Sequence, residues 1–396
     1  MKNLAIIGGG PSALMLAAQI DVTKYRVTLY DQKNTLGRKF LVAGEGGLNL
    51  TFDSSIEDLI QKYIPHQFMD PYIRSFNNED LRNWFLNIGI PTFSGSSHRV
   101  FPEKGIKPIE VLNQIIDHIK EKGVKIELNQ TWKGWDNEGN IIFENSEIIK
   151  ADRVVFALGG ASWSITGSDG HWKIPFEKKG IKVNDFRAAN CAFQIDWPAE
   201  FIQVHRGKPL KNIKVSFEES DSKGELVITA FGIEGNAIYA LSQKIQEEFL
   251  KQKEVIIHLD LKPTLSIKQI QNKIKNSRKS KVTEILKQDL KLDKTAIALL
   301  KIITSKEEFL NTDLIAKNIK SLALNLVNAA PIDEAISTLG GVAIEEVDEN
   351  LQLKKIQNTH VLGEMLDWYA PTGGYLLQGS FSMGHALAQY LNQLDD

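Results

Sequence analysis

Apolar and polar positions near the N-terminus follow two patterns in succession. The unbroken apolar run Leu4–Ile7 leads into Gly8-Gly9-Gly10, and apolar residues then recur at helical spacing at Leu14, Ala17 and Ala18. A short apolar run predicts a buried strand, consecutive glycines predict a tight turn, and spacings of three and four predict a helix. The chain is therefore expected to open with a strand, a turn and a helix.

The rest of the chain shows comparable patterns on both sides of a glycine-poor middle. Residues 236–339 contain no glycine, although the chain has 29. Before and after this stretch, apolar spacing predicts a strand over 26–31, helices over 55–92 and 108–122, a strand over 124–128, a small antiparallel layer at 132–135 and 141–143, a strand over 151–158, and a C-terminal helix. In the middle, alternation within 191–262 predicts an antiparallel sheet or barrel, and 264–326 is expected to be helical.

The first turn has the composition of a dinucleotide-binding motif. Gly8 permits the turn, Gly10 lets the backbone approach a pyrophosphate, and Ala13 keeps the helix close to the strand. Asp31 ends the second predicted strand, 21 residues (31 − 10) after Gly10, where a ribose-binding carboxylate is expected. An acid at this place favours FAD or NAD over NADP. The alternative is a glycine-rich turn in an ordinary α/β domain.

A glycine-rich stretch follows Asp31 closely. Gly37, Gly44, Gly46 and Gly47 all fall within eleven residues, which predicts a loop rather than a helix or strand. Such a loop exposes backbone N–H groups that suit a phosphate or a flavin edge. Arg38 and Lys39 could neutralise a pyrophosphate, and the alternative is a surface loop with solvated charges.

Composition narrows the class of protein. The chain has 396 residues, 42% hydrophobic and 24% charged, with a formal net charge of −2. These values are typical of a globular protein of two or three domains and do not indicate a general nucleic-acid binder. The N-terminal apolar run is too short for a signal peptide and no run reaches transmembrane length, so a cytoplasmic location is expected. Cys191 is the single cysteine, which excludes an internal disulfide and a zinc ribbon, and no metal is expected.

Six segments in order resemble one family, the bacterial FAD-dependent oxidoreductases called BaiN-like or YhiN-like flavoproteins, some of which are labelled aminoacetone oxidases. The segments are Gly37-Arg38-Lys39, Gly46–Thr51, Arg99–Pro102, Thr166–Gly170, Gly363-Glu364 with Asp367, and Thr372–Tyr375. Two departures indicate a divergent branch. Gly47-Leu48 stands where the family has Arg-Cys, and Leu376 stands where it has Asn, so a role for the family's cysteine is not carried over.

The resemblance implies an architecture. It predicts a Rossmann-like α/β domain of the two-dinucleotide-binding flavoprotein type, made of 1–190 and 328–396. Between these parts lie an antiparallel β domain, 191–263, with 328–346 as a candidate addition, and a helical subdomain, 264–327.

The resemblance, together with the glycine motifs, also implies the residues that hold a non-covalent FAD. In this interpretation Asp31 binds the adenosine ribose, Glu364 and Asp367 lie near the ribityl chain, and Gly373 and Gly374 lie near the isoalloxazine. The full set of expected cofactor-binding residues is Gly8, Gly10, Pro11, Ser12, Ala13, Asp31, Gln32, Arg38, Lys39, Gly44, Gly46, Gly47, Asn49, Ala157, Gly159, Gly160, Gly363, Glu364, Asp367, Gly373, Gly374 and Tyr375.

The leading hypothesis is an oxidoreductase that transfers a hydride between FAD and a small organic substrate. NAD(P)H, bound transiently, or oxygen would be the electron partner, because the chain has no second Gly-x-Gly-x-x-Gly motif. No catalytic acid or base can be assigned. One rival is a flavin-bound RNA-associated protein that uses the basic run Lys273–Lys281, although such a run is typical of a solvated helix face and no nucleic-acid partner is expected. A second rival is a dinucleotide-binding module without redox chemistry.

Overall fold

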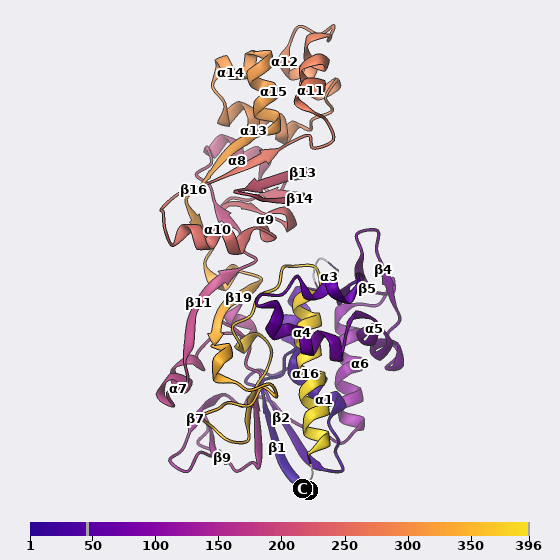
Figure 1. The fold of residues 1–396 in the computed structure, drawn as a ribbon, viewed down its shortest axis with the longest axis vertical. Coiled ribbons are helices and arrows are strands. Elements are labelled where there is room, and N and C mark those ends of the chain that lie inside the picture. The colour runs from indigo at the N-terminus through magenta and orange to yellow at the C-terminus, as the bar shows by residue number, and fades with distance from the viewer. Residues whose placement is uncertain (45–46, 395–396) are drawn as a thin grey trace. The chain divides into compact units, whose positions relative to one another are not determined.

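The computed structural model describes residues 1–44 and 47–394 of the chain, which divides into two compact units. The larger unit consists of Met1–Ala188 and Ile332–Asp396, and the smaller unit is the intervening Ala189–Pro331 (Figure 1). The smaller unit is inserted into the larger one in sequence, so segments more than 300 residues apart in the chain can share one core.

A parallel sheet of five strands is the centre of the larger unit. The strand order is β20-β10-β1-β2-β6. The strands are β1 (Lys2–Ile7), β2 (Tyr25–Tyr30), β6 (Lys125–Glu127), β10 (Arg153–Phe156) and β20 (Thr359–Val361). Ile7 is level with both Tyr30 and Phe156, and Phe156 is level with Val361. Glu127 is in turn level with Tyr30, so this register brings the ends of all five strands to one edge of the sheet, where parallel α/β folds bind their ligands.

Two helices from opposite ends of the chain pack beside this sheet. Helix α1 (Pro11–Gln19) begins with proline at its first position, where a missing N–H is tolerated. Helix α16 (Tyr375–Gln393) lies alongside it (Figure 1). A Cβ on Gly384 of α16 would come within 2.4 Å of the Ser12 carbonyl oxygen of α1, so the two backbones touch only because residue 384 has no side chain. The C-terminal helix thus completes the N-terminal βα unit.

The remaining elements of the larger unit are short and surround this core. They are α2 (Arg38–Ala43), β3 (Thr51–Phe52), α3 (Ile56–Ile60), α4 (His66–Ser75), α5 (Asn78–Asn87), β4 (Thr92–Ser94), β5 (Arg99–Pro102), α6 (Pro108–Glu121), β7 (Trp132–Trp135), β8 (Ile141–Phe143), β9 (Ile148–Ile149), η1 (Ser164–Thr166), α7 (Lys173–Lys178), β11 (Val183–Ala189), η2 (Ile332–Glu334), β19 (Ser337–Val342), η3 (Ile344–Glu346) and η4 (Gly363–Met365). The predicted antiparallel layer at 132–135 and 141–143 is confirmed as β7 and β8.

The prediction of a loop throughout the glycine-rich stretch was wrong for Arg38–Ala43, which form helix α2. The glycines lie at its ends and not inside it. Gly37, with φ 64°, is the N-cap, and Gly44 is the C-cap. Phe40 is buried in the core, and this burial favours a helix over the solvated loop that the glycine count indicated.

An antiparallel sheet of seven strands forms the centre of the smaller unit, in the order β17-β16-β13-β14-β15-β12-β18. Its strands are β12 (Phe193–Gln194), β13 (Pro209–Phe217), β14 (Ser220–Ile228), β15 (Gly232–Glu234), β16 (Val255–Asp260), β17 (Leu322–Leu326) and β18 (Asn328–Ala329). Its helices are α8 (Ala199–His205), α9 (Asn236–Tyr239), α10 (Ser242–Phe249), α11 (Ile267–Lys275), α12 (Val282–Gln288), α13 (Lys294–Ile303), α14 (Lys306–Leu310) and α15 (Thr312–Lys320).

The predicted helical stretch 264–326 ends too late. Residues 322–326 form strand β17, in which Leu322, Leu324 and Leu326 are buried while Ala323 and Asn325 are exposed. This strict alternation has the period of a strand and not of a helix. Capping boxes begin two of the helices that do form in this stretch, at Ser266–Gln269 of α11 and Ser305–Glu308 of α14. Among the described residues, none of the helices combines the length and the apolarity that a membrane crossing requires.

Gly8 is expected to be essential for the fold itself. Its φ is +106°, and an added Cβ would lie 2.3 Å from the Ala157 carbonyl oxygen. Gly8→Ala should therefore lower the free energy of unfolding by roughly 2–4 kcal/mol in a denaturant titration. Gly123→Ala is the matched control, because Gly123 has φ +90° but open space around its Cβ. That variant should lose only about 1 kcal/mol. Equal losses in the two variants would refute the steric argument.

Candidate functional site

A cavity of about 420 Å³ lies at the carboxyl edge of the parallel sheet, entirely within the larger unit. Fourteen of the expected cofactor-binding residues line it: Gly8, Gly10, Pro11, Ser12, Asp31, Gln32, Arg38, Lys39, Asn49, Ala157, Gly159, Glu364, Gly373 and Gly374. Seven others are not in its wall: Ala13, Gly44, Gly47, Gly160, Gly363, Asp367 and Tyr375. The expected residue Gly46 lies outside the described residues.

Of the three glycines in the turn between β1 and α1, all of which line the cavity, only Gly10 has room for a side chain. A Cβ on Gly10 would meet no atom within 4 Å, whereas a Cβ on Gly9 would lie 2.8 Å from Asp31 Oδ2. The wall is thus hollowed in front of Gly10, the residue for which the motif predicts a close approach to a pyrophosphate. Gly10 is also the N-cap of α1, so the positive end of that helix faces the same space.

Asp31 is held in place by the backbone. Its Oδ2 accepts a hydrogen bond from the Gly9 N–H (2.8 Å), and its Oδ1 accepts one from the Lys33 N–H (2.7 Å). Burial raises the pKa of the Asp31 carboxyl, and the two backbone hydrogen bonds oppose that rise. Each carboxylate oxygen has a further lone pair, so the side chain can still accept from a hydroxyl group in the cavity.

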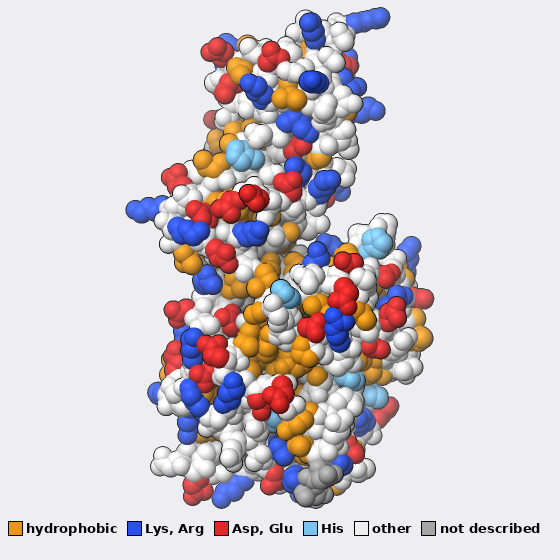
Figure 2. All heavy atoms as spheres, viewed as in Figure 1, with side chains coloured by type: hydrophobic (Ala, Val, Ile, Leu, Met, Phe, Trp, Pro, Cys, Tyr) orange, Lys and Arg blue, Asp and Glu red, His pale blue; other side chains and the backbone are white. Residues whose placement is uncertain are grey.

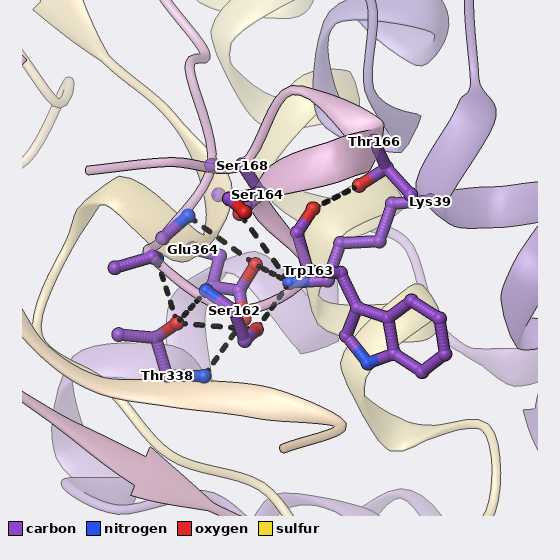
Figure 3. Close-up of polar contacts among 12 residues, drawn as sticks. Lys39, Ser162, Trp163, Ser164, Thr166, Ser168, Thr338 and Glu364 are labelled. Atoms are coloured by element: carbon purple, nitrogen blue, oxygen red, sulfur yellow. Dashed lines mark hydrogen bonds and ion pairs between the residues drawn. The ribbon is translucent and has the colours of Figure 1, made fainter. Parts of the chain in front are cut away.

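Lys39 and Glu364 form an ion pair in the cavity wall (Figure 3). Lys39 Nζ lies 2.8 Å from Glu364 Oε2 and donates to Ser162 Oγ at 2.7 Å. Glu364 Oε1 accepts from the Thr338 N–H (2.9 Å), and Oε2 accepts from the Gly160 N–H (3.3 Å). Both charged groups are therefore engaged within the protein. Sequence reasoning assigned Lys39 and Glu364 to different parts of a cofactor and did not identify them as partners.

Helix α16 begins in the wall of the cavity. Gly374 has φ 94°, and an added Cβ would lie 2.7 Å from the Thr51 backbone, so only glycine fits here. Among the described residues, no acidic side chain lies in the first turn of α16 and no side chain caps it, which leaves its positive end available. Tyr375 instead packs into the core against Phe52, and burial raises its pKa to about 12.

Asn49 contributes an unsatisfied acceptor to the cavity wall. Its Oδ1 is buried and, among the residues that the structure describes, has no hydrogen-bond partner. Buried polar atoms of folded proteins are nearly always paired, so such an atom in a cavity wall calls for a donor from a ligand.

Much of the wall was missed by sequence reasoning, and most of the missed part is apolar. It includes Val42, Ala43, Leu158, Trp163, Ile336, Leu362, Trp368, Pro371, Leu376 and Leu377. Leu376 and Leu377 could have been found, since they occupy the first turn of a helix that the Gly-Gly pair predicts. Ile336 could not, because no motif marks its segment. Asp367, expected near the ribityl chain, instead accepts from the Gly340 N–H and from Asn184 Nδ2.

The histidines and the cysteine lie outside the cavity wall. Burial lowers the pKa of His360 to about 4, so its imidazole is neutral at pH 7, and Asn350 O lies 3.0 Å from its Nδ1. Burial raises the pKa of the Cys191 thiol, in the smaller unit, to about 11. Neither group carries a charge at neutral pH.

Comparison with known proteins gives one family and several relatives. The sequence model of the family described as "HI0933-like protein Rossmann domain" matches residues 2–390. The chain is 24% identical to a 3-dehydro-bile acid delta(4,6)-reductase of Clostridium scindens, over 97% of this chain and 98% of that protein. It is 23% identical to a ribosomal RNA dihydrouridine synthase of Haemophilus influenzae, over 97% and 96%. Its fold is similar to that of a 3-ketosteroid-delta4-(5alpha)-dehydrogenase from Rhodococcus jostii RHA1, with a TM-score of 0.54, 12% identity, and coverage of 99% and 97%.

The Lys39–Glu364 pair should contribute measurably to stability, because the two side chains are only 26% and 19% exposed. Lys39→Met should lower the free energy of unfolding by about 2 kcal/mol or more, since it leaves the carboxylate without its counter-ion. Combining it with Glu364→Gln should cost less than the sum of the single losses, as a double-mutant cycle in urea would measure. Arg74→Met, which breaks the exposed Arg74–Glu57 pair, is the control and should change stability little. Additive losses at 39 and 364 would contradict a direct interaction.

Proposed function

Since the chain belongs to the HI0933-like Rossmann-domain family, we propose that it is an FAD-dependent oxidoreductase that reduces a carbon–carbon double bond conjugated to a carbonyl group. The names of two relatives share this chemistry. A 3-dehydro-delta(4,6) steroid has double bonds in conjugation with a 3-oxo group, and the step from uridine to dihydrouridine saturates a ring bond beside a carbonyl. The substrate of this chain would therefore contain the bond type common to both reactions, a carbon–carbon double bond conjugated to a carbonyl group.

One observation carries the proposal: a single cavity reaches from the β1–α1 turn and Asp31 to the N-terminus of α16. A dinucleotide needs a phosphate-binding turn and a ribose acceptor at one end, and a place for its second ring at the other. The residues present fit FAD in two further respects. The space in front of Gly10 is free for a pyrophosphate. Among the described residues, Asn49 Oδ1 has no hydrogen-bond donor, and the imide N–H of an isoalloxazine could supply one.

In this proposal the chain's own residues bind the cofactor, orient it and exclude water. FAD supplies the hydride carrier. Asp31 would accept from the adenosine ribose, and the N-termini of α1 and α16 would face the phosphates and the flavin pyrimidine ring, where negative charge collects on reduction. The apolar wall, with Leu376 and Leu377, keeps water from that end. Reducing the double bond consumes a hydride from reduced FAD and a proton, so the flavin needs an electron donor, for which we propose NAD(P)H. Oxygen, the other electron partner considered from the sequence, accepts electrons and would serve only a reaction in the oxidising direction.

A second candidate is that the conjugated bond belongs to a uridine in RNA. The observation that favours it is a polar hollow in the helical part of the smaller unit, lined by Lys273, Arg278, Lys279 and neighbouring amide side chains. Lys and Arg side chains are prominent on this part in Figure 2, with Asp and Glu among them. Lys279 is neutralised by Asp289, at 2.5 Å, which weakens the case for a phosphate contact.

Gly10→Val should separate cofactor binding from folding. Because space around its Cβ is open and its φ is −81°, the variant should unfold at the same temperature as the apoprotein of the unchanged chain. The added side chain would occupy the place of the pyrophosphate, so the purified variant should contain less than a tenth of the usual FAD, measured by flavin absorbance. Full occupancy in Gly10→Val would mean that the turn is only structural.

The reaction class can be tested on the reduced protein under anaerobic conditions. Photoreduced enzyme should be reoxidised by 2-cyclohexenone or a 3-oxo-4-ene steroid at least tenfold faster than by the saturated ketone, followed at the flavin absorbance band. A uridine-containing rRNA fragment forms a parallel arm. Faster turnover with RNA that falls steeply with salt would favour the second candidate. If neither the conjugated ketones nor the RNA reoxidise the flavin, and only the later admission of oxygen does, both candidates are contradicted.

A further inference from the structure

Trp163 has a backbone conformation that bulky residues rarely adopt. Its φ is 64° and its ψ is 58°, in the left-handed region. In this region the Cβ of an L-residue crowds the following carbonyl, and only glycine, asparagine and aspartate enter it readily. Such a conformation persists where its surroundings impose it, and it is common at ligand-binding sites.

Hydrogen bonds fix the chain on both sides of Trp163. On one side, the Ser162 N–H donates to Thr338 Oγ1 at 3.1 Å. On the other, the Ser164 N–H donates to Asp333 Oδ1 at 2.6 Å. The Trp163 carbonyl itself accepts from Thr166 Oγ1 at 2.7 Å. The conformation is therefore imposed by neighbours and not by the indole, which leaves the side chain free for another purpose.

The indole ring of Trp163 lies in the cavity wall. Figure 3 shows it pointing away from the polar cluster around Lys39 and Glu364. Within residues 1–44 and 47–394, it stacks on no other aromatic ring, and its Nε1 makes no hydrogen bond. Trp172, nine residues later, behaves as a structural tryptophan usually does: it is buried, and its Nε1 donates to the Gly159 carbonyl.

The segment that carries Trp163 also reaches the ribose-binding end of the cavity. Gln32, the residue after Asp31, donates from Nε2 to the Gly167 carbonyl at 2.7 Å. Thr166, Gly167 and Ser168 line the cavity together with Trp163. A ligand that contacts Asp31 is therefore bordered by this segment.

We infer that the Trp163 indole is a stacking platform for a planar ring of the dinucleotide bound in this cavity. The inference rests on the proposed function, since it takes FAD to be the ligand. An indole offers a large, flat, polarisable face, and stacking on a heteroaromatic ring needs no hydrogen-bond partner. Binding of the ligand then gives the left-handed conformation a function. This backbone conformation directs the indole toward the ligand, which an ordinary conformation at residue 163 would not do.

The test is Trp163→Asn, which removes the ring and suits the left-handed backbone. The apoprotein of this variant should melt at the same temperature as the unchanged apoprotein or higher, while its Kd for FAD should rise about tenfold or more. Trp163→Phe, which keeps an aromatic face, should recover most of the affinity. Titrations with ADP and with FMN then show which half of the dinucleotide uses the ring, because only one of the two should lose affinity.

Lys291→Asn is the matched control. Lys291 also has a left-handed φ, 53°, but it is exposed and lies in the smaller unit, so its substitution should leave the Kd for FAD unchanged. Unchanged binding of FAD, ADP and FMN by Trp163→Asn would overturn the inference alone. A lower melting temperature in Trp163→Asn would also overturn it, since that indicates a structural indole. Failure of the unchanged chain to bind FAD would instead refute the proposed function.

Discussion

The ion pair between Lys39 and Glu364 is the contact on which the shape of the cavity depends. It joins α2 to η4, and the partners of the two side chains bring in β19, through the Thr338 N–H, and the segment after β10, through Ser162. These four segments are distant in the sequence and all contribute a hydrogen-bonding group at this ion pair. A ligand in the cavity would therefore meet few unpaired protein charges, and its phosphates would depend on helix N-termini and on Arg38.

Features that depend on residues close in the sequence could be predicted, and features that depend on residues far apart in the sequence could not. The β1–α1 turn is local, because the apolar run, the glycines and the helix lie within 19 residues, and Asp31 has a fixed offset in that motif. The pairing of Lys39 with Glu364 spans 325 residues and has no local signal. At α2 the local glycine content predicted a loop, but the burial of Phe40 in the core stabilises a helix between Gly37 and Gly44. At β17 the alternation of Leu322, Leu324 and Leu326 is a local strand signal, and the prediction of a helical region over 264–326 is wrong there because it gave this signal no weight.

Two residues that differ from the family pattern, Leu48 and Leu376, have roles typical of leucine, in the core and in an apolar wall. Leu48, at the place of the family's cysteine, is buried in the core of the larger unit, and Leu376 lines the cavity beside the start of α16. Cys191 is buried in the smaller unit with a raised pKa. Since the chain has no second cysteine, a thiol–disulfide relay within one chain is excluded, which agrees with the proposal that FAD is the redox centre.

The claim that the cavity holds FAD is tested most directly by the cofactor that leaves the denatured protein. The purified chain should show flavin absorbance bands. Acid or heat should then release a non-covalent nucleotide with the mass of FAD, at close to one per chain. Release of NAD or FMN, or of no nucleotide after incubation with FAD, would contradict the account, because the β1–α1 turn and Asp31 would then serve another ligand or none.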